Sequence, residues 1–349
     1  MLSCEERLLI EGISHELVSA WLKKQIPELS MPLSFSLIAG GHSNLTFHCE
    51  DSSGRSLVLR RPPLGEILNS AHDMAREHKI ISSLRISAVP VPETLGLCKD
   101  KSVNGAVFYV MDFVDGDVLN DSIIASSLCE QDKQSISKDV VEILCSLHSV
   151  NPDKIGLGDL GRKEGYLSRQ IKRWVAQWNA SKTHKIPEME ESCELLLQNL
   201  PKQIGSAIVH GDFRLGNMIV AGGRVQAVLD WELCTLGDPL ADLGYVLNNW
   251  QTLDEVPEPG EGDQAPTAVG GFFSRDEFLG IYANKTGRDL SNINYYRAFS
   301  HWRLAAIGQG VYKRYLVGAM GTEREMDLEK QKDSVSRRAA AALELLTTT

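Results

Sequence analysis

The stretch that decides the fold is Ile208-Val-His-Gly-Asp-Phe-Arg-Leu-Gly-Asn-Met-Ile-Val-Ala-Gly-Gly-Arg-Val-Gln-Ala-Val-Leu-Asp-Trp-Glu232. Within it, residues 218–229 form two short apolar runs around an Ala-Gly-Gly turn, which predicts a β-hairpin. The hairpin returns the chain, so that Asp230 is expected to emerge near Asn217. A carboxylate at the end of a buried apolar strand is costly unless it meets a cation or hydrogen-bond donors. Asp230 is therefore a candidate cation ligand.

An acid followed five residues later by an asparagine is the spacing that phosphoryl transfer uses. The reaction needs a carboxylate that orients the acceptor hydroxyl, and oxygen ligands that hold Mg²⁺ on the phosphates. The protein-kinase catalytic loop, His-Arg-Asp-x-x-x-x-Asn, has this spacing. We predict that Asp212 is the catalytic base and that Asn217 and Asp230 bind magnesium. The alternative makes Asp212 a loop residue and Asp230 a helix cap.

Three motifs together resemble the aminoglycoside phosphotransferase-like kinase family: His210-Gly-Asp-x-x-x-x-Asn, Leu229-Asp-Trp-Glu and Gly237-Asp-Pro-Leu-Ala-Asp-Leu243. The resemblance covers roughly residues 35–315. It implies an α+β, two-lobed, protein-kinase-like fold with a small N-terminal antiparallel-sheet lobe and a larger, mainly helical C-terminal lobe. It also implies ATP and Mg²⁺ as cofactors and a small-molecule hydroxyl as the acceptor.

Outward from the motifs, the chain divides into a strand-rich beginning and a helical remainder. Residues 5–26 carry apolar side chains at helical spacing, and residues 35–61 alternate apolar runs with turn residues, as an antiparallel meander does. A helix over 71–86 and a buried strand over 107–111 follow. Further helices are predicted over 131–150, 166–179, 188–200, 239–250, 275–285, 293–316 and 325–346. We expect a nucleotide-binding lobe of residues 1–113 and a catalytic and acceptor-binding lobe of residues 114–349.

The resemblance implies nucleotide-binding roles in the first lobe. Arg60 takes the place of the lysine that contacts the α- and β-phosphates, and a guanidinium can grip phosphate bidentately although the two residues are not interchangeable. Arg60 is preferred to Arg61 because it closes the apolar run before a Pro-Pro break. Glu77 matches the helix glutamate that pairs with this cation. The other candidates are a glycine-rich turn with Gly40, Gly41 and Ser43, and the interlobe hinge at Met111, Asp112 and Val114, which would meet adenine.

Residues around the predicted base receive supporting roles. Arg214 is expected to neutralise charge on the transferred phosphate, and His210 to orient the loop. We expect Asp242 to brace the loop, and Asp238 to cap a helix that begins near Pro239.

Two segments resemble the kinase domains associated with acyl-CoA dehydrogenases: Tyr166-Leu-Ser-Arg-Gln-Ile-Lys-Arg-Trp174 and residues 296–310. That branch implies a hydroxy fatty acid or hydroxyacyl-CoA as acceptor and a functional link to an acyl-CoA dehydrogenase. The basic run over 162–185 is either a solvated helix face or a grip for an anion. The candidate substrate ligands are Arg169, Arg173, Arg297 and Arg303. The alternative is that these arginines brace acidic residues inside the protein.

Other functions stay open at this point. A kinase of a cationic amino alcohol or aminoglycoside would want carboxylates near the base, and the acidic segment 251–274 could supply them. That segment is otherwise a surface loop or a lid over a cleft. A nucleotide-binding pseudokinase is disfavoured by the intact base and metal ligands. A Ser/Thr protein kinase is disfavoured because six residues between Asp230 and Gly237 leave no room for a long activation segment.

Composition excludes several classes of protein. The 349 residues are 43% hydrophobic and 23% charged, as in an ordinary globular protein. The net charge of −10 disfavours nucleic-acid binding, and the apolar runs are far shorter than the ~18 residues of a membrane span. Seven scattered cysteines without a Cys-x-x-Cys pair argue against a disulfide scaffold or a zinc ribbon. The N-terminus lacks the pattern of an export signal. We therefore expect a cytoplasmic protein with no nucleic-acid or membrane partner.

Overall fold

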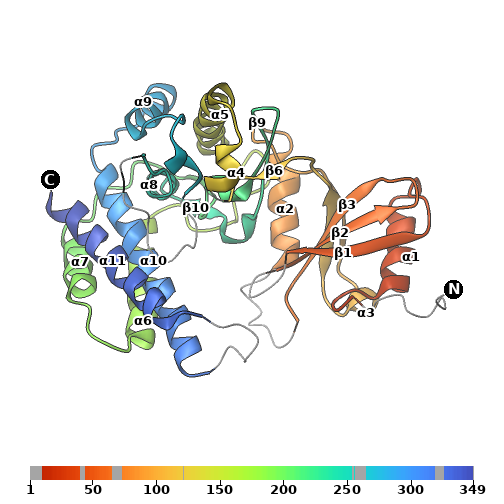
Figure 1. Cartoon of the computed structure of the whole chain (residues 1–349), viewed down its shortest axis with the longest axis horizontal. Coiled ribbons are helices and arrows are strands. Elements are labelled where there is room, and N and C mark those ends of the chain that lie inside the picture. The colour runs from red at the N-terminus through yellow and green to blue at the C-terminus, as the bar shows by residue number, and fades with distance from the viewer. Residues whose placement is uncertain are drawn as a thin grey trace. The chain divides into compact units, whose positions relative to one another are not determined.

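The computed structural model describes residues 10–39, 44–64, 73–120, 122–253, 255, 265–318 and 326–348. The contacts of the chain group it into two units. Unit 1 comprises Met1–Asp115 together with Ala227–Glu232, and unit 2 comprises Gly116–Gln226 together with Leu233–Thr349. Figure 1 shows the sheet of unit 1, with strands β1 to β3 beside helix α1, and the many helices of unit 2.

Unit 1 is built on an antiparallel sheet with strand order β1-β2-β3-β5-β4. Because side chains alternate along a strand, Leu57 and Leu59 enter the core cluster while Arg60 takes the opposite face. Helix α1 covers the core face through Val18 and Leu22, both fully buried. The strands are β1 (Leu33–Ala39), β2 (Leu45–Asp51), β3 (Ser56–Arg61), β4 (Thr94–Cys98) and β5 (Phe108–Asp112), and the helices are α1 (His15–Gln25), α2 (Met74–Leu84) and α3 (Lys101–Asn104).

Three elements of unit 1 differ from the prediction, one of them being the four-residue helix α3, which was not predicted. The first helix begins at His15, later than expected, because Gly12 has a φ of +93°, which is left-handed backbone. Residues 5–9 of the predicted helix lie outside the described residues. Strand β4 was not predicted, since its five residues carry a central Gly96 in place of a clear apolar alternation. The other strands and helix α2 confirm the antiparallel-sheet lobe that the sequence indicated.

Unit 2 is organised around helix α10, which packs against α6, α7, α8 and α11. Helices α8 and α10 approach closely at Gly244, where an added Cβ would lie 2.7 Å from the backbone of Tyr296. Figure 1 shows α10 and α11 side by side. The helices are α4 (Ser122–Ser126), α5 (Glu130–Ser149), α6 (Tyr166–Ser181), α7 (Pro187–Gln198), α8 (Leu240–Asn248), α9 (Arg275–Thr286), α10 (Ile293–Leu316) and α11 (Leu328–Thr347). Helices α5 to α11 confirm the predicted helices of this region, whereas the five-residue helix α4 was not predicted.

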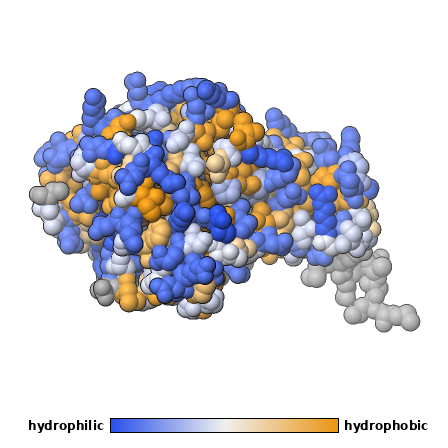
Figure 2. All heavy atoms as spheres, turned by 90° about the horizontal axis from the view of Figure 1, so that it is seen from above, coloured by the Kyte–Doolittle hydropathy of each residue, from blue (hydrophilic) through white to orange (hydrophobic). Residues whose placement is uncertain are grey.

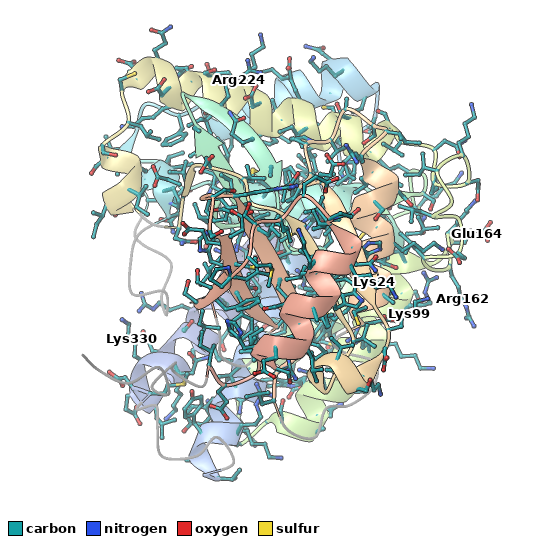
Figure 3. The ribbon with its side chains drawn as sticks, turned by 90° about the vertical axis from the view of Figure 1, so that its right-hand side faces the viewer. Lys24, Lys99, Arg162, Glu164, Arg224 and Lys330 are labelled. Carbon is teal, nitrogen blue, oxygen red and sulfur yellow. The ribbon has the colours of Figure 1, made fainter. Side chains whose placement is uncertain are left out.

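Short strands lie between helices α7 and α8, in the part of the sequence that contains residues 208–232. Strand β7 (Ala207–Val209) pairs antiparallel with β10 (Thr235–Gly237), and β6 (Asp117–Val118), β8 (Met218–Ala221) and β9 (Arg224–Val228) form a second small sheet. Strands β8 and β9 are the predicted hairpin, and Gly222 and Gly223 at its turn both have positive φ. Arg224, labelled in Figure 3, anchors the hairpin by an ion pair of 2.7 Å to Asp139 of α5. This ion pair connects the hairpin to helix α5.

The surface shown in Figure 2 is mostly hydrophilic, with hydrophobic residues in small groups between the polar ones. None of the helices in the described ranges has the length and apolar character needed to span a bilayer.

Candidate active site

The loop after β7 is held by a buried carboxylate. Asp242, in the first turn of α8, accepts hydrogen bonds from the backbone N–H groups of His210, at 2.6 Å, and Gly211, at 2.8 Å. Gly211 has a φ of +88° and approaches Leu233 so closely that a Cβ would lie 3.0 Å from it. His148 packs against Asp242 from α5, with 3.4 Å between its Nε2 and Oδ2. This geometry confirms the prediction that Asp242 braces the loop.

Asp212 has both carboxylate oxygens engaged by donors. The Tyr245 hydroxyl donates to Oδ1, and the Asn217 amide donates to Oδ2 at 2.7 Å and to the Asp212 carbonyl at 2.8 Å. The Arg214 Nε lies 3.5 Å from Oδ1. The carboxylate is therefore fixed in one orientation and stays about a quarter exposed, at 23% of its side-chain surface. A carboxylate in that state can accept a hydrogen bond from an incoming hydroxyl group.

Tyr245 is a functional candidate that the sequence analysis missed. It lies three residues after Asp242, so both side chains share one face of α8. The Arg303 guanidinium stacks over its ring at 5.2 Å and donates from Nη2 to the Gly211 carbonyl at 3.1 Å. Burial, reinforced by Asp212, raises the pKa of the Tyr245 phenol, which is therefore a hydrogen-bond donor. The i, i+3 spacing from Asp242 was the signal that could have found it.

In unit 1, Arg60 lies between two carboxylates. Its Nη1 is 3.3 Å from Glu77 Oε1, and its Nη2 is 3.1 Å from Asp230 Oδ1. Burial by itself would lower the pKa of Arg60, but Tyr109, Glu77 and Asp230 outweigh that effect and raise it, so the guanidinium keeps its charge. Burial raises the pKa of Glu77 in spite of Arg60.

Arg61, the other candidate for the phosphate-binding cation, bonds to backbone carbonyl groups instead of carboxylates. It donates to the backbone carbonyl groups of Gly12, at 2.6 Å, and Asn104, at 3.1 Å. Between the two arginines, only Arg60 faces Glu77 and Asp230 within the residues described here. Asp230 itself has a φ of +62°, a left-handed conformation that is rare outside glycine and costs ~1–3 kcal/mol unless its surroundings enforce it.

The magnesium ligands can be tested by their chemistry. Among the described residues, no three His, Cys, Asp or Glu side chains gather closely enough to bind a metal ion by themselves. Mg²⁺ on a nucleotide does not need such a cluster, because phosphates and water supply most of its oxygens beside one or two protein ligands. Asn217 offers Oδ1, since its Nδ2 is spent on Asp212, and Asp230 offers a carboxylate that is 30% exposed. Each of these oxygen donors, taken by itself, has the chemistry that a phosphate-bound magnesium prefers.

Asp212 and Tyr245 line a cavity of about 460 Å³ in unit 2, which we name the α6–α10 cavity. Trp174 and Arg303 line the same space, and the indole N–H of Trp174 and the Nε of Arg303 are buried without a hydrogen-bond partner in the described part of the chain. Its four arginines are Arg173, Arg214, Arg303 and Arg314, and its apolar wall contains Leu233, Leu304 and Ile307.

The structure brings two of the four candidate substrate arginines into this cavity. Arg173 and Arg303 line it, whereas Arg169 turns back and donates to the Arg162 carbonyl at 2.7 Å. Figure 3 shows Arg162 and Glu164 projecting outward from the same segment. Arg297 lines a second cavity of about 420 Å³, named here the α8–α11 cavity, and donates to Asn248 at 3.1 Å.

The other predicted site residues lie in different environments, and some lie outside the described residues. Met111 is buried in β5, the Asp112 N–H donates to the Glu93 carbonyl at 2.8 Å, and Val114 follows the strand half-buried. Asp238 accepts from the Leu240 N–H at 3.1 Å, as a helix cap does. The predicted glycine-rich turn at Gly40, Gly41 and Ser43, and residues 254 and 256–264 of the acidic segment, lie outside the described residues.

A strand-rich unit with an Arg–Glu pair and a helical unit with an Asp-x-x-x-x-Asn loop define a phosphotransferase of the kinase-like fold. The model of the phosphotransferase enzyme family matches residues 34–270, and the chain belongs to this family.

Solved structures agree with the fold. A Ralstonia eutropha protein, provisionally named an aminoglycoside phosphotransferase, is 32% identical and superposes with a TM-score of 0.80 over 95% of this chain and 98% of its own. Aminoglycoside phosphotransferase APH(4)-Ia, solved in a ternary complex with AMP-PNP and hygromycin B, is 14% identical, with a TM-score of 0.61 over 96% of this chain and 100% of its own. The predicted α+β, two-lobed fold is thereby confirmed.

The curated relatives are named as acyl-CoA dehydrogenase family members. Acyl-CoA dehydrogenase family member 10 of Mus musculus is 36% identical over 88% of this chain, and family member 11 of Homo sapiens is 36% identical over 85%. The chain spans 29% and 38% of their lengths, respectively. The predicted resemblance to kinase domains associated with acyl-CoA dehydrogenases is confirmed.

Proposed function

We propose that this chain transfers a phosphoryl group from ATP, with Mg²⁺, to a hydroxyl group of a small anionic molecule, a hydroxy fatty acid or hydroxyacyl-CoA. The observation that carries the proposal is the α6–α10 cavity, where four arginines surround a space that contains Asp212. Guanidinium groups bind carboxylates and phosphates bidentately. The names of the relatives support an acyl chain as the rest of the molecule.

The charge in the cavity favours an anionic acceptor. Asp212 is the one acidic side chain among the described residues that line it. A cationic amino alcohol would meet four positive charges and, at that wall, a single carboxylate. The unpartnered N–H groups of Trp174 and Arg303 need acceptor atoms, which a carboxylate, a phosphate or a thioester carbonyl supplies. Leu304 and Ile307 suit a short hydrocarbon segment.

The local geometry supports each proposed role. Asp212 accepts a hydrogen bond from the acceptor hydroxyl and orients its oxygen toward the γ-phosphate. Arg214, next to Asp212, neutralises charge that develops on the phosphoryl oxygens. Arg60 binds the nucleotide phosphates, held in place by Glu77. When bound to the phosphates, Mg²⁺ supplies charge neutralisation, and Asn217 and Asp230 are the side chains that would hold it.

The test follows phosphoryl transfer from ATP·Mg²⁺ by mass spectrometry. The acceptors offered are short 4-hydroxyacyl-CoAs and the free hydroxy acids, beside choline, homoserine and an aminoglycoside. We expect phosphorylation of an anionic acceptor by the wild type and its loss in Asp212→Asn. The matched control is Asp153→Asn, which removes an exposed carboxylate paired with Lys163 at the surface and should leave transfer intact.

Other outcomes separate the alternatives. Transfer only to a cationic alcohol would keep the kinase and reject the anionic acceptor. Binding of ATP without transfer to any acceptor or to water would favour a pseudokinase. A functional link to an acyl-CoA dehydrogenase, proposed from the names of longer relatives, predicts that the phosphorylated acyl-CoA is a substrate for such an enzyme.

A further inference from the structure

Asp212, the predicted base, accepts a hydrogen bond from a residue outside its own loop. Asn217 and Arg214 come from the same loop as Asp212, but Tyr245 reaches Asp212 from helix α8. It is thus a link between a catalytic carboxylate and a rigid helix, and a side chain on a helix holds its partner more firmly than one on a loop.

The Tyr245 ring is itself buried and covered on one face. The side chain is 7% exposed, and the Arg303 guanidinium of α10 covers its face at 5.2 Å. Arg303 also donates to the Gly211 carbonyl, the residue directly before Asp212. The phenol, the guanidinium and the loop backbone therefore form one connected set of contacts around the carboxylate.

We propose that Tyr245 is a positioning residue, which holds the Asp212 carboxylate in the orientation that receives the acceptor hydroxyl, with Arg303 holding Tyr245. The inference rests on the proposed function, because it takes Asp212 as the group that receives the hydroxyl. Tyr245 does not take a proton in the reaction. Its hydroxyl donates to Oδ1 throughout and leaves the remaining lone pairs of Asp212 for the acceptor.

A hydrogen bond that only stabilised the fold would have different consequences. Loss of a structural contact lowers thermal stability and leaves turnover per folded molecule unchanged. Loss of a positioning contact leaves substrate binding intact and lowers turnover, since misplacement of a reacting group matters in the transition state. The kcat and KM values of a variant therefore distinguish the two roles.

The experiment compares Tyr245→Phe with Tyr296→Phe. Both substitutions delete one buried hydroxyl that donates to an aspartate, Asp212 in the first case and Asp238, at 2.7 Å, in the second. We expect Tyr245→Phe to lower kcat ~10- to 100-fold with KM for ATP and acceptor changed less than ~2-fold. Tyr296→Phe should keep kcat. Equal kcat in wild type and Tyr245→Phe would overturn the proposal.

A spectroscopic measurement tests the contact without any acceptor. All eight tyrosines lie in described ranges, and of these only Tyr245 donates to Asp212. In protein labelled at tyrosine ¹³Cζ, one resonance should shift between wild type and Asp212→Asn, and it should be the one missing in Tyr245→Phe. An unchanged spectrum would overturn the inference even if Tyr245→Phe failed to fold. Absence of transfer by the wild type, with this shift present, would instead count against the proposed function alone.

Discussion

The α6–α10 and α8–α11 cavities are both lined by arginines, but they differ in the acids that face them. In the α8–α11 cavity, Arg275 pairs with Glu255, and Glu344 lines the same space. In the α6–α10 cavity, four arginines meet Asp212 as the one acid within the described lining. Arginine by itself therefore does not mark an anion site. The proposed anion site is the cavity in which the arginines of the described lining outnumber the acids.

The largest expected difference between the cavities is catalytic. Asp212→Asn should lower kcat by ~10²–10⁴-fold while ATP still binds, because the carboxylate acts on the acceptor in the transition state. Glu255→Gln, the corresponding change in the α8–α11 cavity, should leave kcat within ~2-fold. Steady-state kinetics of both variants measure this. Near wild-type turnover of Asp212→Asn would show that the base is assigned to the wrong residue.

A smaller difference concerns acceptor binding. Arg173→Met should raise KM for an anionic acceptor ~10-fold, since one charge-assisted hydrogen bond contributes ~1.5–3 kcal/mol. Arg297→Met should not change KM, because that side chain bonds to Asn248 in the other cavity. Equal effects of the two substitutions on KM would contradict the proposed difference between the two cavities.

The α8–α11 cavity should instead respond in stability. Arg275 donates to Glu255 and to the Leu247 carbonyl, at 2.8 Å for the latter, so Arg275→Met removes bonds that connect α9 to α8. We expect the free energy of unfolding to fall by ~1–2 kcal/mol, discounted because Glu255 is partly exposed. Urea denaturation measures it, with Arg173→Met as the control that should leave stability within ~0.5 kcal/mol.

The smallest expected effect is a pH dependence from His301, which lines the α8–α11 cavity. Burial, with the nearby Arg338, Arg297 and Arg275, lowers its pKa from 6.5 to about 3. The unfolded state therefore binds a proton that the folded state does not, and stability falls as pH drops below 6.5. Between pH 6.5 and 5.5 the loss should approach ~1 kcal/mol. His301→Gln should flatten this slope in urea denaturation at the two pH values, and an unchanged slope would contradict the assignment.

The sequence predicted most of the fold, because helix periodicity and turn residues are local signals. Helix α10 begins and ends at the predicted residues 293 and 316. Strand β4 and the start of α1 were missed where glycines interrupt or replace the pattern.

The candidate site was harder to predict, since it depends on contacts between distant segments. The spacing from Asp212 to Asn217 lies within one loop and could be recognised. That Arg173 and Arg303 share a cavity while Arg297 does not depends on how α6, α8 and α10 pack, which residue counting does not give. Tyr245 was missed for the same reason, although its spacing of three residues from Asp242 indicates that both side chains lie on one face of α8.

Gly244 has a consequence for how specificity can change. At this residue α8 meets α10 backbone to backbone, with no layer of side chains between them. The two helices that carry Tyr245 and Arg303 therefore have a separation set by main-chain atoms. Helix α6 contributes Arg173 and Trp174 to the cavity, and its close approach to Gly237 is made by the side chain of Tyr166, not by its backbone. If the α6–α10 cavity binds the acceptor as proposed, we expect substitutions on α6 to change which acceptor fits while the contacts between Tyr245, Arg303 and Asp212 stay the same.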